Sequence, residues 1–169
     1  MTLEARVFRR VMRSLAAGVT VVTVRDQRGH PWGLTATAVC LVSWRPPLLL
    51  ACIERSADCH EAFVKAEAFA VHLLRDDQED LSRHFASKDV GKFETIAWRD
   101  GDTGAPILDG VLGHVECRTT ARYPAGDHTI LLGEAVGGAL RAAGETGAPL
   151  LHFRGEYVRV VSNARVTPS

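Results

Sequence analysis

Two long strand patterns joined by a short turn are the feature that most constrains the fold of this chain. Residues 111–123 and 128–140 both have the composition of strands, and the segment between them reads Pro-Ala-Gly-Asp. Proline, glycine and aspartate favour tight turns, so this region predicts an antiparallel hairpin.

Shorter strand patterns occur on both sides of the hairpin. Residues 19–24 read VTVVTV and are β-branched throughout, which favours a strand. Further strands are expected at 32–43 (with a kink), 48–53, 69–74, 149–153 and 157–161. The sequence predicts that residues 1–169 form one mainly β domain, a β-barrel of about six to eight strands that carries a few helices.

Three segments have helical patterns. Apolar residues at helical spacing predict an amphipathic helix over 3–16, with arginines on its other face. Ser56 is a good N-cap for a helix at 57–66, and Asp76 with Glu79 resembles a capping arrangement for a helix at 77–86. Residues 87–105 are expected to be a long connecting loop, which in a compact domain usually has a function.

Composition excludes several classes of partner. Lys and Arg number 20 and Asp and Glu number 20, so no broad basic field for nucleic acid is expected. The chain has no run of about 18 apolar residues, and arginines interrupt its N-terminal segment, so we expect neither a membrane span nor a signal peptide. The four cysteines lie far apart without a C-x-x-C pair. They are expected to be reduced thiols of a cytoplasmic protein.

Familiar catalytic and nucleotide-binding motifs do not occur in the sequence. It has no G-x-G-x-x-G after a strand and no G-x-x-x-x-G-K-[ST], which disfavours Rossmann and P-loop nucleotide binding. It also has no H-E-x-x-H and no G-x-S-x-G. No metal site is therefore expected, and a classical hydrolase is disfavoured.

The segment from Gly33 to Ser56 suits a planar, phosphorylated ligand. It begins with small and hydroxyl residues at 33–38, continues through an apolar strand, and ends in Arg55-Ser56 before a helical pattern. Small residues let a flat ring lie against the backbone, and a helix start can hold a phosphate. The combination suggests a flavin nucleotide, although a strand of small residues is as often a tight packing surface.

Two further features stand out. Phe85-Ala86 precedes a basic loop with Lys88 and Lys92, and Gly126-Asp127-His128-Thr129 begins a long strand. Each has an ordinary interpretation, because a Phe that ends a helix is usually core, surface lysines are usually solvated, and Gly-Asp-His usually forms a turn.

Together and in this order, these segments resemble the short-chain flavin reductase family. The resemblance extends from about residue 8 to residue 160, and the segments that carry it are 17–23, 33–36, 46–48, 85–86, 104–110, 116–117 and 126–134. It implies an FMN-binding split barrel, usually homodimeric, that reduces FMN or FAD with NADH or NADPH. The reduced flavin would then diffuse to a separate flavin-dependent oxygenase.

The resemblance also implies a set of site residues. Those expected to hold the flavin are Thr35, Ala36, Thr37, Ala38, Cys52, Ile53, Arg55, Ser56, Phe85 and Lys92. Arg55-Ser56 would face the phosphate, and Phe85 with its loop would close over the flavin. His128 matches the family histidine near the nicotinamide and is the expected catalytic residue, and Tyr157 lies where the nicotinamide nucleotide is often held.

The sequence departs from the family pattern at two places. Thr37-Ala38 stands where many relatives have two serines, and Cys40-Leu41 stands where a Thr-Ser pair is common. These changes leave the choice between FMN and FAD open. Two alternative functions also remain: a flavoprotein that retains FMN and acts directly as an oxidase or monooxygenase, and a non-enzymatic flavin- or haem-binding module.

Overall fold

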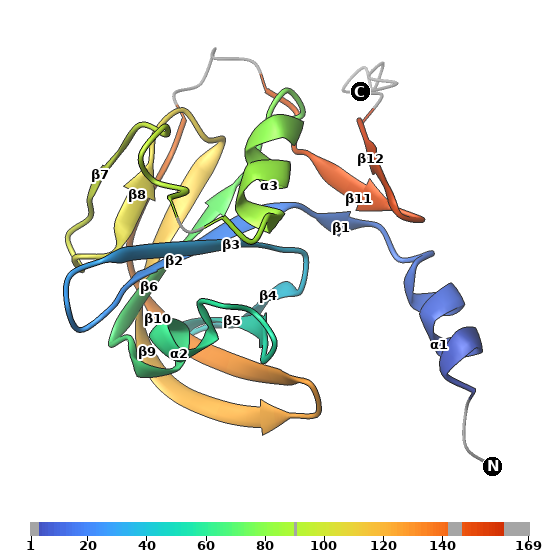
Figure 1. Cartoon of the computed structure of the whole chain (residues 1–169), viewed down its shortest axis with the longest axis horizontal. Coiled ribbons are helices and arrows are strands. Elements are labelled where there is room, and N and C mark those ends of the chain that lie inside the picture. Colours follow the sequence, from blue (N-terminus) through green and yellow to red (C-terminus); the bar gives the residue numbers. More distant parts are fainter. Residues whose placement is uncertain (1–3, 90, 142–146, 161–169) are drawn as a thin grey trace, which may run out of the picture.

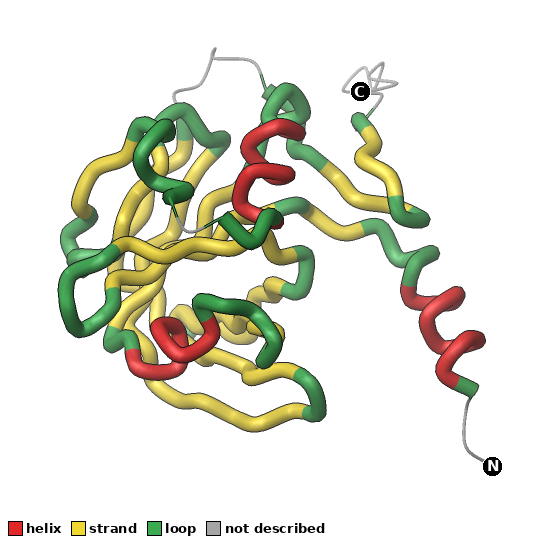
Figure 2. The backbone as a smooth tube through the Cα atoms, in the orientation of Figure 1, coloured by secondary structure: helices red, strands yellow, loops and turns green. Residues whose placement is uncertain are grey.

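The structure is a computed structural model that describes residues 4–89, 91–141 and 147–160. Strands dominate it (Figure 2). Its helices are α1 (Ala5–Met12), α2 (His60–Lys65) and α3 (Glu79–Ala86). Its strands are β1 (Ala17–Gly18), β2 (Thr20–Arg25), β3 (Pro31–Ala36), β4 (Val39–Trp44), β5 (Pro47–Glu54), β6 (Ala68–Leu73), β7 (Trp98–Asp100), β8 (Pro106–Leu108), β9 (Gly113–Ala125), β10 (His128–Leu140), β11 (Leu151–Phe153) and β12 (Glu156–Val158).

The main sheet curls back on itself. Its seven strands are antiparallel neighbours in the order β3-β2-β6-β9-β10-β5-β4, so β3 and β4 are its two edges. Only Thr37 and Ala38 separate these edge strands in the sequence, and three peptide units span at most about 11 Å. The two edges must therefore approach each other there, and the N–H of Cys52 donates to the carbonyl of Ala38 at 2.9 Å. The result is a barrel with an opening along one side.

The single strand expected at 32–43 is therefore two strands. Its predicted kink is present, but the chain leaves one edge of the sheet as β3 and enters the other edge as β4. The predicted hairpin is confirmed as β9 and β10, which pair along their length. Gly126 in its turn has φ +62°, a conformation that glycine adopts without strain.

The core lies inside the curled sheet and under the two helices near it. Its largest fully buried side chains include Phe63 of α2, Phe69 of β6 and Leu131 of β10. A second buried cluster lies beneath α3 and includes Val21 and Phe85. Figure 1 shows α2 and α3 on either side of β3, so these helices flank the opening of the barrel.

The helix expected at 3–16 is shorter in the structure and buries none of its residues. Residues 5–12 form α1, which stands apart from the strands (Figures 1 and 2). The chain continues into β1, which pairs with β11 in a small sheet that also contains β12. The two predicted C-terminal strands are confirmed as β11 and β12, with residue 161 outside the described residues.

Three local predictions are wrong. Ser56 does not cap α2, because that helix begins at His60 with Cys59 before it. Asp76 does not cap α3, because Gln78 precedes the helix and its side-chain oxygen accepts from the N–H of Arg75 at 2.9 Å. The expected loop at 87–105 contains β7, which pairs with β8 as a separate two-stranded sheet.

Candidate functional site

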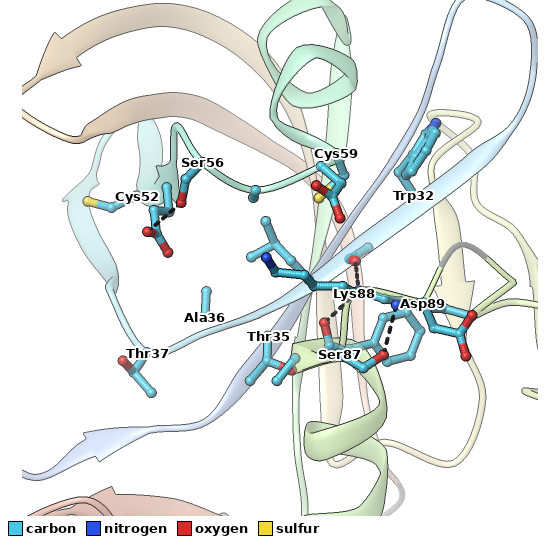
Figure 3. Close-up of a pocket in the computed structure, with 18 of the residues that line it drawn as sticks. Trp32, Thr35, Ala36, Thr37, Cys52, Ser56, Cys59, Ser87, Lys88 and Asp89 are labelled. Atoms are coloured by element: carbon cyan, nitrogen blue, oxygen red, sulfur yellow. Dashed lines mark hydrogen bonds between the residues drawn. The ribbon is translucent and has the colours of Figure 1, made fainter.

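A cavity of about 400 Å³ lies at the opening of the barrel. Three segments line it: residues 31–38 of β3 and just after it, residues of 52–59 at and after the end of β5, and residues of 85–93 at and after the end of α3. His128 at the start of β10 also lines it. Figure 3 shows Cys52 and Ser56 on one side, with Ser87, Lys88 and Asp89 on another. The three sequence segments expected to form one site therefore meet in a single pocket.

β3 supplies one wall of the pocket with small side chains. Thr35, Ala36, Thr37 and Ala38 all line the cavity, as the sequence predicts. The hydroxyl of Thr35 is already used, since it donates to the carbonyl of Ser82 in α3 at 2.6 Å. As an edge strand, β3 also presents backbone N–H and C=O groups on the side away from β2.

The end of β5 shows which predicted residues can reach a ligand. Successive side chains of a strand point to opposite faces, and Cys52, Glu54 and Ser56 line the pocket. Ile53 is fully buried in the core, and Arg55 is exposed and does not line the pocket. The side chains of Ile53 and Arg55 are thus not among those that the structure brings to the site.

Ser56 lies in the pocket with a carboxylate beside it. Its hydroxyl donates to Glu54 at 2.6 Å, in a turn that precedes α2. The sequence predicts Ser56 at a helix start, where backbone N–H groups would bind phosphate. This prediction is wrong for Ser56, because α2 begins four residues later.

Phe85 lies beneath the pocket rather than over it. Its ring is fully buried and contacts the ring of Phe93 edge to face at 5.3 Å between centroids. A Cβ added to Gly33 would stand 2.7 Å from the Phe85 ring, so glycine is needed for β3 to approach α3 this closely. The ring supports the pocket wall, and the Phe85 carbonyl accepts from Lys92 at 2.9 Å.

Two lysines place positive charge in the pocket, which is also lined by the carboxylates of Glu54, Asp58 and Asp89. The ammonium of Lys92 is half-buried and bonds the carbonyls of Phe85 and Gly33, at 2.9 and 3.4 Å. Burial lowers the pKa of Lys92, and the nearby Cys59 and Asp58 counteract this. Lys88 is exposed and has no ion pair or hydrogen bond within the part of the chain that the structure describes.

His128 lies at the edge of the pocket, and one of its ring nitrogens is hydrogen-bonded to Asp127. Its Nδ1 is 2.7 Å from Oδ1 of Asp127, and its side chain is 39% exposed. Hydrogen bonding to His128 holds the pKa of Asp127 below its usual value. The carboxylate therefore orients the imidazole and leaves Nε2 available to a ligand.

Tyr157 is not brought to this pocket. It lies on β12, and its hydroxyl is 2.8 Å from the hydroxyl of Ser82. The guanidinium of Arg83 stacks over its ring at 5.0 Å. Within the described chain, Tyr157 anchors the small sheet to α3.

Sequence reasoning missed several lining residues. Trp32, Glu54, Asp58 and Ser87 all line the cavity. Glu54 could have been found from its alternation with Cys52 along β5. Asp58 lies in the turn that the sequence suggested was already helix, so no local pattern marked it.

The pocket fits a flat ring that carries a phosphate. Its volume lies within the range of about 300–1,000 Å³ typical of small-molecule sites. Ala36 and Ala38 leave room for a planar ring against the backbone, and Lys88 offers a cation for an anionic group. Both halves of a flavin nucleotide thus have suitable partners.

Comparison with known proteins identifies the family. The family model described as flavin reductase like domain matches residues 12–160. The chain belongs to the flavin reductase-like family. This confirms the resemblance found in the sequence, and the predicted split β-barrel with antiparallel strands and few helices is likewise confirmed.

Individual relatives of this flavin reductase-like domain cover most of its length. It is 41% identical over 154 residues to a flavin reductase (NADH) of Kitasatospora aureofaciens, covering 90% of this chain and 80% of the relative. A solved structure of a Streptomyces globisporus NADH:FAD oxidoreductase with NAD and FAD fragments is 36% identical, with a TM-score of 0.86 over 97% of this chain and 99% of the other. Nitrilotriacetate monooxygenase component B of Mycobacterium thermoresistibile is 33% identical, with a TM-score of 0.87 over 97% and 90%.

Proposed function

We propose that the pocket between β3 and β5 binds FMN or FAD, and that the chain reduces this flavin with NADH or NADPH. The chain is an NAD(P)H:flavin oxidoreductase. The observation that carries the assignment is the single pocket where the small residues of β3, the end of β5, Lys88 and His128 meet. Similarity to the NADH-dependent flavin reductase of Kitasatospora aureofaciens supports it.

Catalysis by this chain rests on positioning. A bound flavin supplies the hydride acceptor, and the reduced pyridine nucleotide supplies the hydride. The two cofactors, and not protein side chains, therefore provide the reacting groups. The protein must hold two flat rings in contact and exclude other arrangements. Ala36 and Ala38 give one ring a flat place beside β3, which suits this task.

The backbone at 35–38 is proposed to hold the polar edge of the flavin. The chain here leaves the edge strand, where N–H groups without a strand partner can donate. Donors placed where negative charge develops favour the reduced product. Backbone donors can hold the flavin at this wall without side-chain hydroxyls. This is consistent with Thr35, whose hydroxyl already donates to the Ser82 carbonyl.

His128 is proposed to orient the nicotinamide. Asp127 holds Nδ1, so Nε2 is the nitrogen that faces a ligand. A neutral imidazole fixed in this way can accept from the amide of the nicotinamide and keep its ring against the flavin. The role is one of orientation, since hydride transfer needs little acid–base help.

The phosphate is proposed to lie near Lys88. Lys88 lines the cavity and has no ion pair in the described chain, whereas Ser56 donates to Glu54 and Arg55 lies outside the cavity. Phosphate binding by an exposed lysine is electrostatic and salt-sensitive. This replaces the assignment of Arg55 that the sequence suggested.

Two apolar surfaces support a homodimer. On α1 and in the residues just after it, five apolar side chains from Val7 to Leu15 are between 42% and 64% exposed. On the edge strand β4, Leu41, Val42 and Trp44 are 50%, 49% and 79% exposed. Apolar patches of this kind are typical of surfaces that another chain covers, and we infer that a second copy does so.

The reduced flavin is proposed to serve a separate oxygenase by diffusion. Relatives include a protein named as the reductase subunit of a flavin-dependent monooxygenase in Mycobacterium tuberculosis. Among the helices that the structure describes, none has the length and apolarity needed to cross a bilayer. All four cysteines are free thiols, which supports the proposed cytoplasmic location.

One assay tests the proposed function. Purified protein is mixed with NADH or NADPH and then with FMN, FAD or riboflavin, and the nicotinamide absorbance is followed. Oxidation that requires both protein and flavin is expected with at least one pair. Absence of oxidation with every pair would overturn the assignment, and turnover of an organic substrate by the protein alone would instead indicate a self-contained monooxygenase.

A further inference from the structure

A second cavity of about 340 Å³ opens beside the flavin pocket. It lies between the β2–β3 turn, which contains Arg28, and α2, which contains Lys65. Trp32 and Asp58 line both this cavity and the flavin pocket. The two cavities are therefore neighbours that share these side chains as a common wall.

Trp32 has a fixed orientation in this wall. Its indole N–H donates to Oδ2 of Asp26 at 3.0 Å, and its ring and that of His30 meet edge to face at 5.1 Å between centroids. The backbone N–H groups of Arg28 and His30 donate to the other oxygen of Asp26, at 2.9 and 2.8 Å. An indole held in this way is a preformed stacking surface, and stacking on aromatic side chains is how proteins commonly bind a nucleic base.

Polar groups around Trp32 suit a ribose and a pyrophosphate. Asp58 stands on the shared wall, where a carboxylate can accept from ribose hydroxyls, and it is close enough to Lys92 to interact with its charge. The guanidinium of Arg28 has no partner in the described chain, whereas Lys65 is paired with Glu61. Arg28 on one side and Lys88 on the other thus leave two cations available to a pyrophosphate.

We propose that the second cavity binds the adenosine half of FAD, with adenine stacked on Trp32 and the ribose hydroxyls bonded to Asp58. This inference rests on the proposed function, because it extends the same flavin site. It identifies FAD as the preferred flavin over FMN, which lacks the adenosine half.

The geometry favours FAD over the pyridine nucleotide as the source of this adenosine. His128, where the nicotinamide is placed, pairs with Glu54 and so lies at the β5 end of the pocket. Figure 3 shows Trp32 at the opposite end of the pocket from Cys52 of β5. A flavin that lies along β3 reaches the second cavity directly with its diphosphate end.

The test compares dissociation constants of FAD and FMN by calorimetry for wild type, Trp32→Ala, Trp32→Phe and Tyr123→Ala. Wild type is expected to bind FAD at least about tenfold more tightly than FMN. Trp32→Ala should bring this ratio close to one through weaker FAD binding, while Trp32→Phe keeps a stacking face and most of the ratio. Tyr123 is 53% exposed on β9 and lines neither cavity, so Tyr123→Ala should keep the wild-type ratio.

Other outcomes overturn the inference without affecting the proposed function. Equal affinities of wild type for FAD and FMN, with normal flavin-dependent NADH oxidation, would contradict the adenosine site and leave the proposed function intact. An unchanged ratio in Trp32→Ala, with a raised KM for NADH, would assign the cavity to the pyridine nucleotide. Failure of wild type to bind either flavin would instead reject the proposed function.

Discussion

His72 of β6 is fully buried, and each of its ring nitrogens forms a hydrogen bond, one to β2 and one to β8. Its Nδ1 donates to the carbonyl of Val21 at 3.0 Å, and the N–H of Leu108 donates to its Nε2 at 3.1 Å. Only the neutral ring can accept at Nε2 while donating at Nδ1. Burial lowers the pKa of His72 to about 4. This histidine therefore holds two strands together only while it is uncharged.

The first prediction concerns stability in acid. The unfolded chain takes up a proton at His72 near its ordinary pKa of 6.5, whereas the folded chain does so near 4. The stability that His72 contributes is therefore complete above about pH 6.5 and is lost as pH falls towards 4, by roughly 3 kcal/mol. Urea unfolding of wild type and His72→Gln between pH 7 and 4.5 measures this, and the variant should show a smaller decrease.

A matched control for this prediction is His30→Gln in the exposed β2–β3 turn. It should keep the wild-type pH dependence of the free energy of unfolding. If His72→Gln and wild type lose equal stability over this range, His72 is not the group responsible.

The second prediction concerns His128 and its carboxylate. His128→Ala removes the ring that is proposed to orient the nicotinamide, so the KM for the pyridine nucleotide should rise about tenfold or more while flavin affinity changes little. Asp127→Asn keeps a hydrogen-bond partner for Nδ1 and should have a smaller effect. Steady-state kinetics with each nucleotide measures both. Wild-type turnover and wild-type KM in His128→Ala would contradict the assignment.

At the scale of elements, the pocket depends on the contact between β3 and α3. Three interactions join them: the Gly33 backbone lies against the Phe85 ring, Thr35 donates to the Ser82 carbonyl, and Lys92 bridges the carbonyls of Phe85 and Gly33. The edge strand that forms this wall of the pocket is thus fixed from behind by a helix.

The third prediction tests this contact. Gly33→Ala places a methyl group 2.7 Å from the Phe85 ring, so the free energy of unfolding should fall by about 1–3 kcal/mol and flavin should bind more weakly. Gly18→Ala is the control, because nothing lies within 4 Å of the added carbon. Thermal unfolding and flavin titration of both variants measure the difference. Equal stability of Gly33→Ala and wild type would contradict this prediction, because it would show that β3 can move away from α3 at no cost.

Elements were predicted from sequence where the pattern is local. The β9–β10 hairpin and the strand β5 follow from composition and turn residues alone, although only Ala51 and Ile53 of β5 are fully buried. The split of residues 32–43 between two edges of the sheet could not be predicted, because Thr37 and Ala38 carry no turn signal and the separation depends on pairing with β2 and β5. The start of α2 was missed for a related reason, since Ser56 bonds Glu54 rather than the helix.

For the site residues too, local sequence patterns were sufficient for some predictions, whereas others depend on how the strands pair. The order of the segments predicted that β3, the end of β5 and His128 form one pocket. Which side chains of 52–56 face it depends on strand register, so Ile53 and Arg55 were included and Glu54 was missed. Trp32 and Asp58 acquire their importance only from a second cavity that tertiary structure creates.

At the scale of the whole molecule, one sheet ties distant parts of the chain together. Its strands come from residues 20 to 140, and its two edges meet at the pocket. We propose that residues 1–169 form a single domain, because removal of any sheet strand would open the barrel that holds the site.

The fourth prediction concerns assembly. Wild-type protein should sediment as a dimer, because the exposed apolar side chains of β4 and α1 would otherwise contact water. Leu41→Asp places a charge on the β4 patch and should shift the protein towards monomer by analytical ultracentrifugation. Lys65→Asp on α2, away from both surfaces, is the control. A monomeric wild type at micromolar concentration would contradict the proposed homodimer.

Hydride is proposed to pass from the pyridine nucleotide to a flavin held between β3 and β5. The most direct test is anaerobic rapid mixing of NADH with protein and one equivalent of flavin, followed at the flavin absorbance band. Ala38 is exposed in the pocket wall, so Ala38→Phe fills the ring site without disturbing the core, and exposed Ala97 outside the pocket provides the control Ala97→Phe. We predict rapid bleaching with wild type and Ala97→Phe, and bleaching slowed at least about a hundredfold with Ala38→Phe. Bleaching at the wild-type rate in a folded Ala38→Phe protein would show that the flavin ring does not lie against β3.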